Sequence, residues 1–535
     1  MSGWSRKFSG ALVCAGLALA FGGLPERTAA ADSGILRLSQ RNEPADLDPA
    51  TATLPDEFFI IRALAEGLVV PATDGGAPQP AAAETWEISP DRLTYAFRLR
   101  DGARWSNGEP VTADDFVASY RRVLNPATAA PKADLFFAVK NARAYTAGQI
   151  TDFSAVGFRA EDARTLVVTL ERPTPNFLLY AASGPWIPVN PRVVEKFGRT
   201  WTRPENHVGN GAFSLVDWRP HQHIAVKKNP AFPAGAGAKV GEIRFVALDN
   251  GDAEERAYRA GQIDVTMSVP VSKLDTYARE RPDELHRAPL AETHYLTFNT
   301  QRAPLNDVRV RRALALSIDR ARIVERVLRG GQQPAGWLVP PSLRQNPREK
   351  DLSPGLALRF DPAEARRLLA EAGFAGGQKF PRLELTSWAR PAVLEAVQAM
   401  WKQELGIEVG IVMREAKVHV DSLRTGGYAI GFITQIPDVA DPAAVLGDFT
   451  TAAPGNYPHW SDPAFDSQLN EFVAATDPSR RAILLTALER RLIAACPATP
   501  LYFNAKNWLM SPRVQGWEED ALWTRNYRNV SLGEK

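Results

Sequence analysis

Cysteine is nearly absent from this 535-residue sequence, which contains only Cys14 and Cys496. Because Cys14 lies in an N-terminal segment that we expect to be removed, the mature chain keeps one cysteine and forms no intramolecular disulfide. Stability must therefore come from burial of apolar side chains. A hydrophobic content of 45% supplies enough of them, and a chain of this length predicts roughly two to four core units.

The sequence also lacks an excess of charge of either sign. It has 63 basic and 61 acidic residues, and removal of the N-terminal segment with Arg6, Lys7, Glu26 and Arg27 leaves equal numbers of each. No general field then draws the chain to nucleic acid or to an anionic membrane. We expect partners to be recognised by local sites, and no nucleic acid among them.

Long apolar runs are absent after Leu24. Before it, Arg6 and Lys7 precede an apolar run from Ala11, and Ala29-Ala30-Ala31 stand before Asp32. This order is typical of a secretory signal with its cleavage site, and the run is shorter than the roughly 20 residues that cross a bilayer. We expect residues 1–31 to be removed on export. Cys14 lies inside the run, where a lipoprotein signal would not place its lipid-bearing cysteine.

The usual catalytic motifs are also missing, since no phosphate loop, His-Glu-x-x-His, Cys-x-x-Cys or Gly-x-Ser-x-Gly occurs. His207, His221 and His223 lack a cysteine or carboxylate at ligand spacing, so we predict no metal site. The acidic pairs at 114–115 and 254–255 fall on predicted helix starts, where carboxylates favour the helix dipole. We therefore predict no enzyme and no cofactor, with a secreted hydrolase as the alternative from another class.

Alternating strands and helices run through the sequence and predict an α/β protein. Residues 94–100 alternate with period two, as a half-buried strand does. Thr112 and Asp115 form a predicted capping box that opens the next helix. Asp361 begins another helix, with proline in its first position and Gly373 after its last residue.

Two further stretches carry the predicted architecture of the second half. Asp307 is predicted to begin one helix that runs through Leu328 to a double glycine. A strand at 383–386, a helix at 392–405 and a strand at 407–412 read as a βαβ unit.

The segment 428–433 is apolar on both parities, as expected of a central strand covered on both faces. It leads directly into Thr434-Gln435-Ile436-Pro437-Asp438. Ligands of open α/β sheets bind beyond the carboxyl ends of strands. Asp438 therefore stands at a favoured position for a binding carboxylate.

A set of short runs keeps a distinctive order along the chain. The runs are Leu47-Asp48-Pro49, Ala65-Glu66-Gly67-Leu68, Glu84-Thr85-Trp86, Phe97-Arg98-Leu99-Arg100, residues 105–116, Gly209-Asn210-Gly211-Ala212-Phe213, Gly261-Gln262-Ile263-Asp264, residues 306–314 and Asp462-Pro463-Ala464-Phe465-Asp466. Together they resemble extracellular solute-binding protein family 5, the periplasmic oligopeptide- and dipeptide-binding proteins of ABC importers.

This resemblance implies the α/β periplasmic-binding-protein type II fold, with two hinged lobes and an additional inserted domain. Lobe I would comprise residues 32–65, 187–289 and 508–535. The inserted domain would span 66–186, and lobe II 290–507.

The resemblance also implies a site in which an extended peptide lies between the lobes. Asp438 matches the family's aspartate that holds the peptide's α-ammonium group. Main-chain groups of Thr434, Ile436 and Leu54 would bind the peptide as an added strand, so that its backbone supplies affinity and its side chains preference. Burying this carboxylate on closure would require a cation, which the ammonium provides.

At other positions of the implied site the sequence departs from the best-known members, which carry an aromatic pair and basic residues. Here these positions hold Lys132, Ala416, Phe432 and Gln435, and Ile436 replaces a cysteine. Phe432 removes a basic partner for a peptide's terminal carboxylate, whereas Lys132 could supply one elsewhere. Peptide length and recognition of the peptide ends stay open on this evidence.

The implied partners are a short peptide and an inner-membrane permease powered by cytoplasmic ATPases, and we expect a periplasmic monomer. A non-peptide ligand such as an opine, an oligosaccharide or a metal chelate is the alternative within the same fold. A sensor role, in which the closed protein engages a receptor, is a third possibility.

Overall fold

The computed structural model describes residues 34–73, 76–233, 239–344, 357–533. The predicted signal segment 1–31, with Cys14, lies outside these ranges. Within them, no helix combines the length and the apolar character that a membrane crossing needs.

A four-stranded sheet with the order β1-β10-β9-β8 forms the centre of the range predicted as lobe I. Its strands are β1 (Ile35–Gln40), β8 (Phe213–Arg219), β9 (His223–Lys228) and β10 (Glu242–Ala247). Helix α1 (Pro55–Leu64) buries Phe59, Ile60 and Ile61 in the same core as Leu36 and Phe245. Helices α6 (Gly251–Arg259) and α7 (Val271–Glu280) follow.

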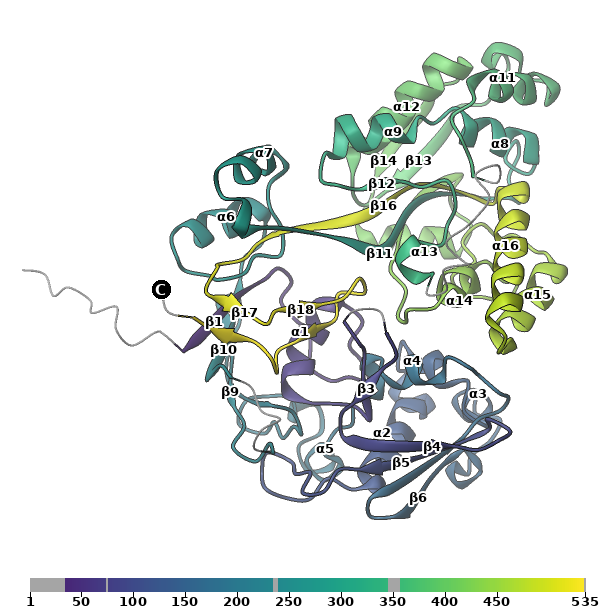
Figure 1. The fold of residues 1–535 in the computed structure, drawn as a ribbon. Helices are drawn as coiled ribbons and strands as arrows, with labels where there is room; N and C mark the ends of the chain where they lie inside the picture. Colours follow the sequence, from purple (N-terminus) through teal and green to yellow (C-terminus); the bar gives the residue numbers. More distant parts are fainter. Residues whose placement is uncertain (1–33, 74–75, 234–238, 345–356, 534–535) are drawn as a thin grey trace, which may run out of the picture. The chain divides into compact units, whose positions relative to one another are not determined.

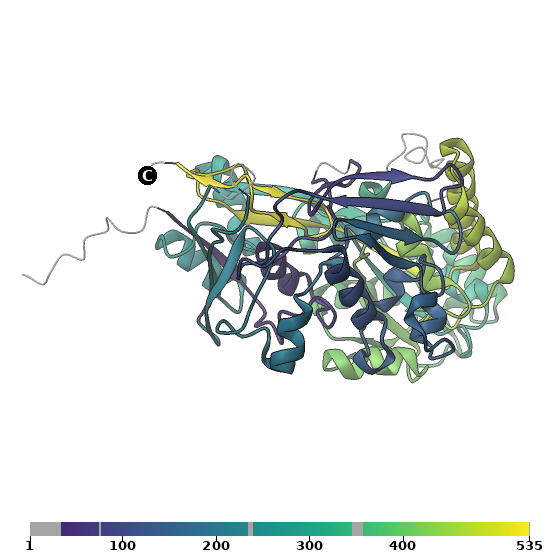
Figure 2. The same ribbon diagram turned by 90° about the horizontal axis from the view of Figure 1, so that it is seen from below.

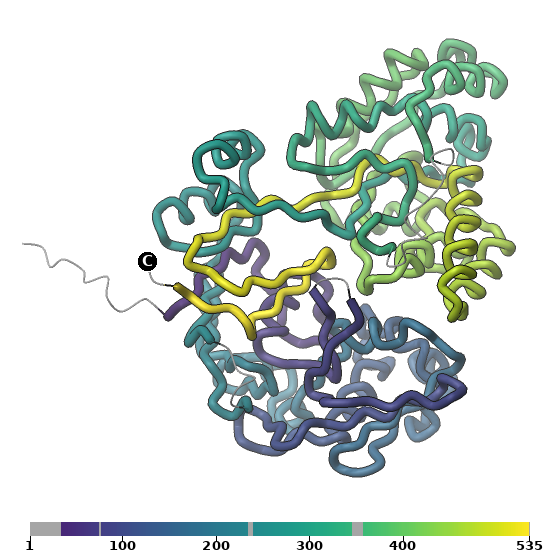
Figure 3. The backbone as a smooth tube through the Cα atoms, in the orientation of Figure 1, coloured from purple at the N-terminus to yellow at the C-terminus, as the bar shows by residue number. Residues whose placement is uncertain are grey.

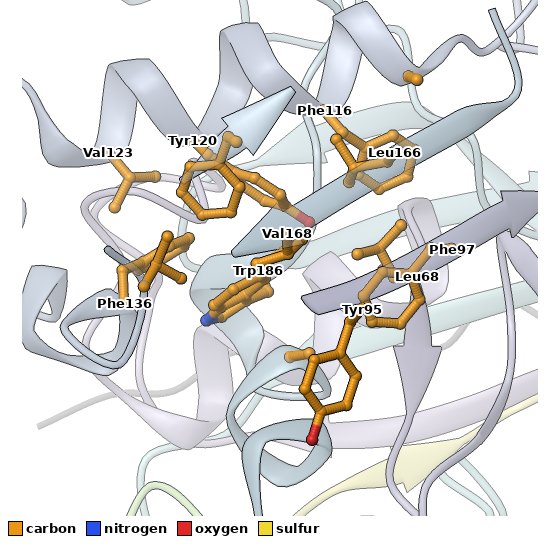
Figure 4. Packing of buried hydrophobic residues seen from close by; sticks show 14 of the residues in the cluster. Leu68, Tyr95, Phe97, Phe116, Tyr120, Val123, Phe136, Leu166, Val168 and Trp186 are labelled. Carbon is orange, nitrogen blue, oxygen red and sulfur yellow. Dashed lines mark hydrogen bonds between the residues drawn. The ribbon is translucent and has the colours of Figure 1, made fainter. Parts of the chain in front are cut away.

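The range 66–186 contains its own antiparallel sheet, with the order β4-β5-β7-β6. The strands are β4 (Ala83–Ile88), β5 (Thr94–Leu99), β6 (Phe158–Asp162) and β7 (Thr165–Thr169), and Figures 1 and 2 both show β4 beside β5. The short strands β2 (Val69–Val70) and β3 (Gln79–Pro80) pair separately. Helix α2 (Ala113–Leu124) contacts β6 and β7. Figure 4 shows the aromatic core of this domain, where Tyr120, Phe136 and Trp186 gather.

Short helices complete the inserted range and join it to lobe I. They are α3 (Ala142–Thr146), α4 (Phe177–Ala181) and α5 (Pro191–Phe197). Phe58 of α1 fills the space beside Gly184, where an added Cβ would meet its ring at 2.1 Å. Lobe I and the inserted domain are therefore packed directly against one another.

A six-stranded sheet with the order β12-β16-β11-β15-β13-β14 organises lobe II. Its strands are β11 (Leu285–Phe298), β12 (Gln333–Pro334), β13 (Leu383–Ser387), β14 (Val409–Met413), β15 (Ile430–Gln435) and β16 (Ala498–Leu509). Its longer helices are α8 (Val308–Leu316), α11 (Pro362–Glu371), α12 (Pro391–Leu405), α13 (Ala416–Arg424), α15 (Pro463–Ala474) and α16 (Pro478–Ala495). The short helix α14 (Pro442–Leu446) follows β15.

Strands β11 and β16 are the long elements that connect the two lobes (Figures 1 and 3). They pair antiparallel over most of their length, with a register shift between Pro289 and Thr293. Both predicted boundaries of lobe II, at 289/290 and 507/508, fall within this pair. Two neighbouring strands with an irregular register offer a place where the chain can bend.

The last residues of the chain return to the N-terminal part, as the yellow and purple segments of Figure 3 show. Arg513 donates hydrogen bonds to Asp264 and to the carbonyl of Ile35. The strands β17 (Val514–Gln515), β18 (Glu518–Glu519), β19 (Arg525–Asn526) and β20 (Ser531–Leu532) form two small hairpin-like sheets. Contacts between α1 and β19 complete the core of lobe I.

Most of the local predictions are confirmed. The Thr112 side chain accepts from the Asp115 amide, and the Asp115 carboxylate accepts from the Thr112 amide. Asp361 caps α11. Strands β13 and β14, which α12 connects, pair in parallel. The prediction of one helix from Asp307 to Leu328 is wrong. Helix α8 ends at Leu316, and Asp319 begins a second helical segment, Arg320–Leu328, by accepting from the Arg322 amide. Asp319 can satisfy free helix amides by itself, so it starts a new helix where the apolar spacing suggested continuity.

Candidate ligand-binding site

Asp438 follows the central strand β15 and stands at the border of lobe II. Its side chain is 41% exposed, and its Oδ1 accepts from the ammonium group of Lys132, a residue of the inserted domain. The strand is buried from Ile430 to Ile433, so a rigid core element positions the exposed carboxylate. The structure therefore brings together Lys132 and Asp438, which the sequence predicted as separate site residues.

A pocket of about 970 Å³ of empty volume, including its open mouth, lies beside Asp438. Lobe I, the inserted domain and lobe II all contribute to its wall. The lining residues are Arg62, Pro71, Ala72, Thr73, Gly76, Leu179, Ala182, Ser183, Ser342, Leu343, Asp438, Val439, Ala440, Asp520, Ala521, Leu522 and Thr524. Pockets of this size with mostly apolar walls and a few charged groups are typical of small-ligand sites.

Arg62, from the last turn of α1, is the cation of this pocket. Its Nη2 donates to the carbonyl of Ala182 at 3.1 Å. Burial lowers the pKa of Arg62 to about 10, and the charge of Asp520 partly opposes this shift. At neutral pH the guanidinium is still charged, so the pocket has a positive group from lobe I and a negative group, Asp438, from lobe II.

Gln435 lies beneath this border and holds a second carboxylate. Its Nε2 donates to Asp448 Oδ2 at 2.7 Å and to the Val445 carbonyl at 3.1 Å. Burial raises the pKa of Asp448 to about 6; the hydrogen bond from Gln435 opposes this shift, and the charges of Asp134 and Asp438 contribute to it. The surroundings of Asp438 are thus rich in negative charge, which favours a cation from the ligand.

We predict that Asp448→Asn gains stability relative to the wild type as the pH rises from 4 to 7. The folded-state pKa of Asp448, about 6, lies above its ordinary value of 3.8, so the folded state binds more protons in this window. Its contribution to stability falls as the pH rises through the window, and asparagine lacks that loss. Urea unfolding of both proteins at several pH values measures the difference. If the unfolding free energy of Asp448→Asn minus that of the wild type stays constant or falls with rising pH, this assignment is contradicted.

One edge of β15, the strand that leads to Asp438, is largely unpaired. Strand β11 pairs with β15 from Ile430 to Gln435, whereas β13 pairs with it only at Ile430 and Gly431. Within the described ranges, no backbone hydrogen bond reaches the N–H or the C=O of Ile436. The backbone from Thr434 to Ile436 can therefore accept an added strand on this side.

Leu54 lies at the start of α1, in lobe I. Its N–H donates to Glu57 Oε2 at 2.9 Å, and its carbonyl accepts from the amides of Glu57 and Phe58. Both main-chain groups are thus used to cap the helix. Its side chain is 45% exposed, and Ile436 is 39% exposed, so each lobe presents one exposed apolar side chain from a predicted site position.

Phe432 and Ala416 have different surroundings. The Phe432 side chain is fully buried in the lobe II core, 5.6 Å from the ring of His294 and 5.9 Å from that of Trp388. It does not line the pocket beside Asp438. Ala416 is the exposed first residue of α13.

The histidines and acidic residues that the sequence analysis considered as metal ligands or catalytic groups make other contacts in the structure. No group of three or more potential metal ligands occurs in the part of the chain that the structure describes. His223 pairs with Asp217 at 3.1 Å, and His207 stacks on Trp201. Asp115 caps α2, while Glu254 accepts from the amides of Met267 and Ser268. These acidic residues serve the fold.

Arg62 and Asp520 were not predicted as site residues. One lies within a helix and the other near the C-terminus, and no local pattern connects them. Only the return of the chain's last segment to α1 brings them to the same pocket.

Two sheets joined by a pair of long strands, with a charged pocket between them, define a two-lobed ligand-binding protein. The family model described as "Bacterial extracellular solute-binding proteins, family 5 Middle" matches residues 77–457. The periplasmic oligopeptide-binding protein OppA of Escherichia coli (strain K12) is 33% identical over 527 residues, which cover 96% of each chain. The probable deoxycholate-binding periplasmic protein YgiS of the same organism is 33% identical over 508 residues, 92% of each chain.

Solved structures agree with the sequence matches. The Escherichia coli murein tripeptide binding protein MppA has a TM-score of 0.84 at 31% identity, covering 94% of this chain and 99% of that one. Haemophilus influenzae OppA in complex with RPPGFSPFR has a TM-score of 0.79 at 29% identity, with coverages of 94% and 99%. The chain belongs to the bacterial extracellular solute-binding proteins, family 5, and its fold is the type II periplasmic-binding-protein fold.

Proposed function

We propose that this protein is exported to the periplasm after removal of residues 1–31. There it binds short peptides between its lobes and delivers them to an inner-membrane ABC permease with cytoplasmic ATPases. Relatives named as oligopeptide-binding proteins, and a relative solved with a bound peptide, support this function. The observation that carries it is the combination of a pocket-lining carboxylate, Asp438, with the open edge of β15 beside it.

This combination fits the chemistry of a peptide's amino end. An ammonium group pairs with the carboxylate, and the peptide backbone that follows can bond with the strand edge from Thr434 to Ile436. Apolar walls such as Leu179, Leu343 and Val439 accept side chains of varied shape. Closure about β11 and β16 would then enclose the ligand, as hinge-type binding proteins do.

Asp438→Asn is expected to weaken binding of a tetrapeptide with a free amino end by about tenfold or more, which corresponds to ~1.4 kcal/mol. The variant keeps the shape of the side chain and removes the charge that pairs with the ammonium. Isothermal titration calorimetry measures the loss. The matched control is Asp421→Asn, an exposed carboxylate of α13 in the same lobe, and its affinity should equal that of the wild type. An unchanged affinity in Asp438→Asn would refute the proposed ammonium site.

The natural ligand can be identified by mass spectrometry of small molecules released on unfolding the protein purified from its native periplasm. Short peptides with free amino ends support the proposal. A single opine, oligosaccharide or metal chelate would contradict the peptide assignment while leaving the family unchanged.

A second candidate ligand is an apolar carboxylate. The specific observation is Arg62, a charged guanidinium in a pocket whose wall includes Leu179, Leu343 and Leu522. The relative YgiS is named as a probable deoxycholate-binding protein. Titration with deoxycholate, alone and in competition with a tetrapeptide, separates the two candidates, because tight binding of the steroid acid with no binding of peptide favours this one.

A further inference from the structure

Lys132 occupies the position in which a ligand's ammonium group would be expected. It precedes a short helical turn, Ala133–Phe136, of the inserted domain, and its Nζ donates to Asp438 Oδ1. The Lys132 side chain is 21% exposed and that of Asp438 41%. Among the residues that the structure describes, the ion-pair partner of Asp438 is Lys132.

The ammonium group of Lys132 and the α-ammonium of a peptide have the same charge and the same three N–H donors. Two such groups at one carboxylate repel each other, so a peptide ammonium that reaches Asp438 must displace Lys132 or share the carboxylate at a cost. Asp134 and Asp448, the other acidic groups that interact with Asp438, reduce this repulsion. They do not remove the competition for the same oxygen atoms.

A ligand without an ammonium group meets a different situation. Enclosing an unpaired carboxylate is costly, and this cost is what normally makes such a site reject blocked amino ends. Here Asp438 keeps its partner when the ligand brings none. The loss of binding free energy for a ligand with a blocked amino end, or for a non-peptide ligand, is therefore smaller than in a site whose carboxylate has no resident counter-ion.

We propose that Lys132 is a specificity-determining residue: a resident counter-ion that competes with the ligand's ammonium for Asp438 and thereby broadens the ligands that the protein accepts. This inference rests on the proposed binding function. It assigns Lys132 a role different from that of a partner for the peptide's carboxylate.

Other contacts between the same two parts of the chain make this proposal testable. Asn176 donates to Asp441, and Arg172 to Asn470 at 3.5 Å, both from the inserted domain to lobe II. Asp441 also pairs with Arg481 at 3.0 Å. Loss of the Lys132 side chain therefore leaves the two parts connected, and Lys132→Met retains a chain of similar length that can cover the ring of Phe58, 6.0 Å from Nζ.

The experiment compares Ala-Ala-Ala-Ala with its N-acetylated form by isothermal titration calorimetry. The measured quantity is the ratio of the acetylated to the free dissociation constant. In Lys132→Met this ratio is expected to rise by about tenfold or more over the wild type, because the free peptide binds more tightly and the acetylated one more weakly. Lys132→Arg, which retains the positive charge, should stay near the wild-type ratio. Lys140→Met, an exposed lysine of the same domain, is the matched control.

The outcomes separate the two proposals. A ratio in Lys132→Met that equals or falls below the wild-type ratio overturns the role of Lys132, provided that Asp438→Asn brings the ratio to about one. If neither peptide binds the wild type, or if Asp438→Asn leaves the ratio unchanged, the proposed peptide site fails and this inference fails with it. Thermal unfolding of each variant verifies that the compared proteins are folded.

Discussion

Trp186→Ala is expected to lower the free energy of unfolding by about 3–5 kcal/mol, the cost of emptying a large aromatic site in a packed core. Trp186 is fully buried at the centre of the inserted domain (Figure 4). Its ring stacks on Phe136 at 4.4 Å with an angle of 3°, and Tyr120 meets it edge-on at 4.9 Å. Its Nε1 donates to the carbonyl of Leu135. Alanine would remove all of these contacts and leave a cavity.

Guanidinium unfolding followed by circular dichroism measures this loss. Trp86→Ala is the matched control, because Trp86 lies on the same domain's sheet but is only partly buried, and it should cost clearly less. A loss below about 1 kcal/mol for Trp186→Ala would show that the core can collapse around the missing ring. Leu135 and Phe136 follow closely after Lys132, so the variant should also alter discrimination between free and acetylated peptides.

Glu519→Gln is expected to destabilise the protein by about 3–5 kcal/mol, because it leaves buried cations without their counter-ion. Glu519 accepts from Lys506 Nζ with both carboxylate oxygens at 2.5 Å, and it pairs with Arg525 at 3.3 Å. All three side chains are at most 6% exposed. Lys506 belongs to β16, one of the two strands that connect the lobes, and its Nζ lies 4.8 Å from the ring centroid of Trp508 and 5.1 Å from that of Trp523.

Chemical unfolding at pH 7 tests this expectation, and the double variant Lys506→Met/Glu519→Gln is its control. Replacing both members of a buried pair is far less costly than removing one, so the double variant should recover part of the lost stability. A single variant as stable as the wild type would show that water already reaches Glu519.

The pH dependence provides a second readout of the same pair. Burial lowers the pKa of Lys506 from 10.5 to about 8, although the charge of Glu519 opposes the shift. Between these values the unfolded chain binds more protons, so this lysine's contribution to stability rises with pH. The stability of the wild type relative to Lys506→Met should therefore increase from pH 7.5 to 10.

Several features could be predicted because they depend on neighbours in the sequence. The caps at Thr112 and Asp361 and the strand at 94–99 are examples, since side chains within a few residues satisfy their backbone groups. The burial of β15 followed from its unbroken apolar composition. Asp438 could be singled out because it follows that strand.

Other features could not be predicted, because competing local or distant interactions decide them. Glu57 uses the main chain of Leu54 for a helix cap, although the family resemblance assigned those main-chain groups to a bound peptide. Asp319 divides a helix that its apolar spacing presented as continuous. In both cases a specific side-chain contact to the backbone decides the local structure, and neither a family resemblance nor an apolar spacing specifies that contact.

By itself, the sequence determined the order and type of most elements, the strand that leads to Asp438 and the resemblance to a binding-protein family. The type of an element depends on residues close together in the sequence, and the resemblance is the sum of many short matches. Neither requires knowledge of which distant residues are in contact. The tertiary structure alone decided that Lys132 pairs with Asp438, 306 residues away, and that Arg62 and Asp520 share a pocket. Such pairings arise when separate sheets and helices pack together, and the arrangement of those elements, rather than the residues between them, sets which charges meet.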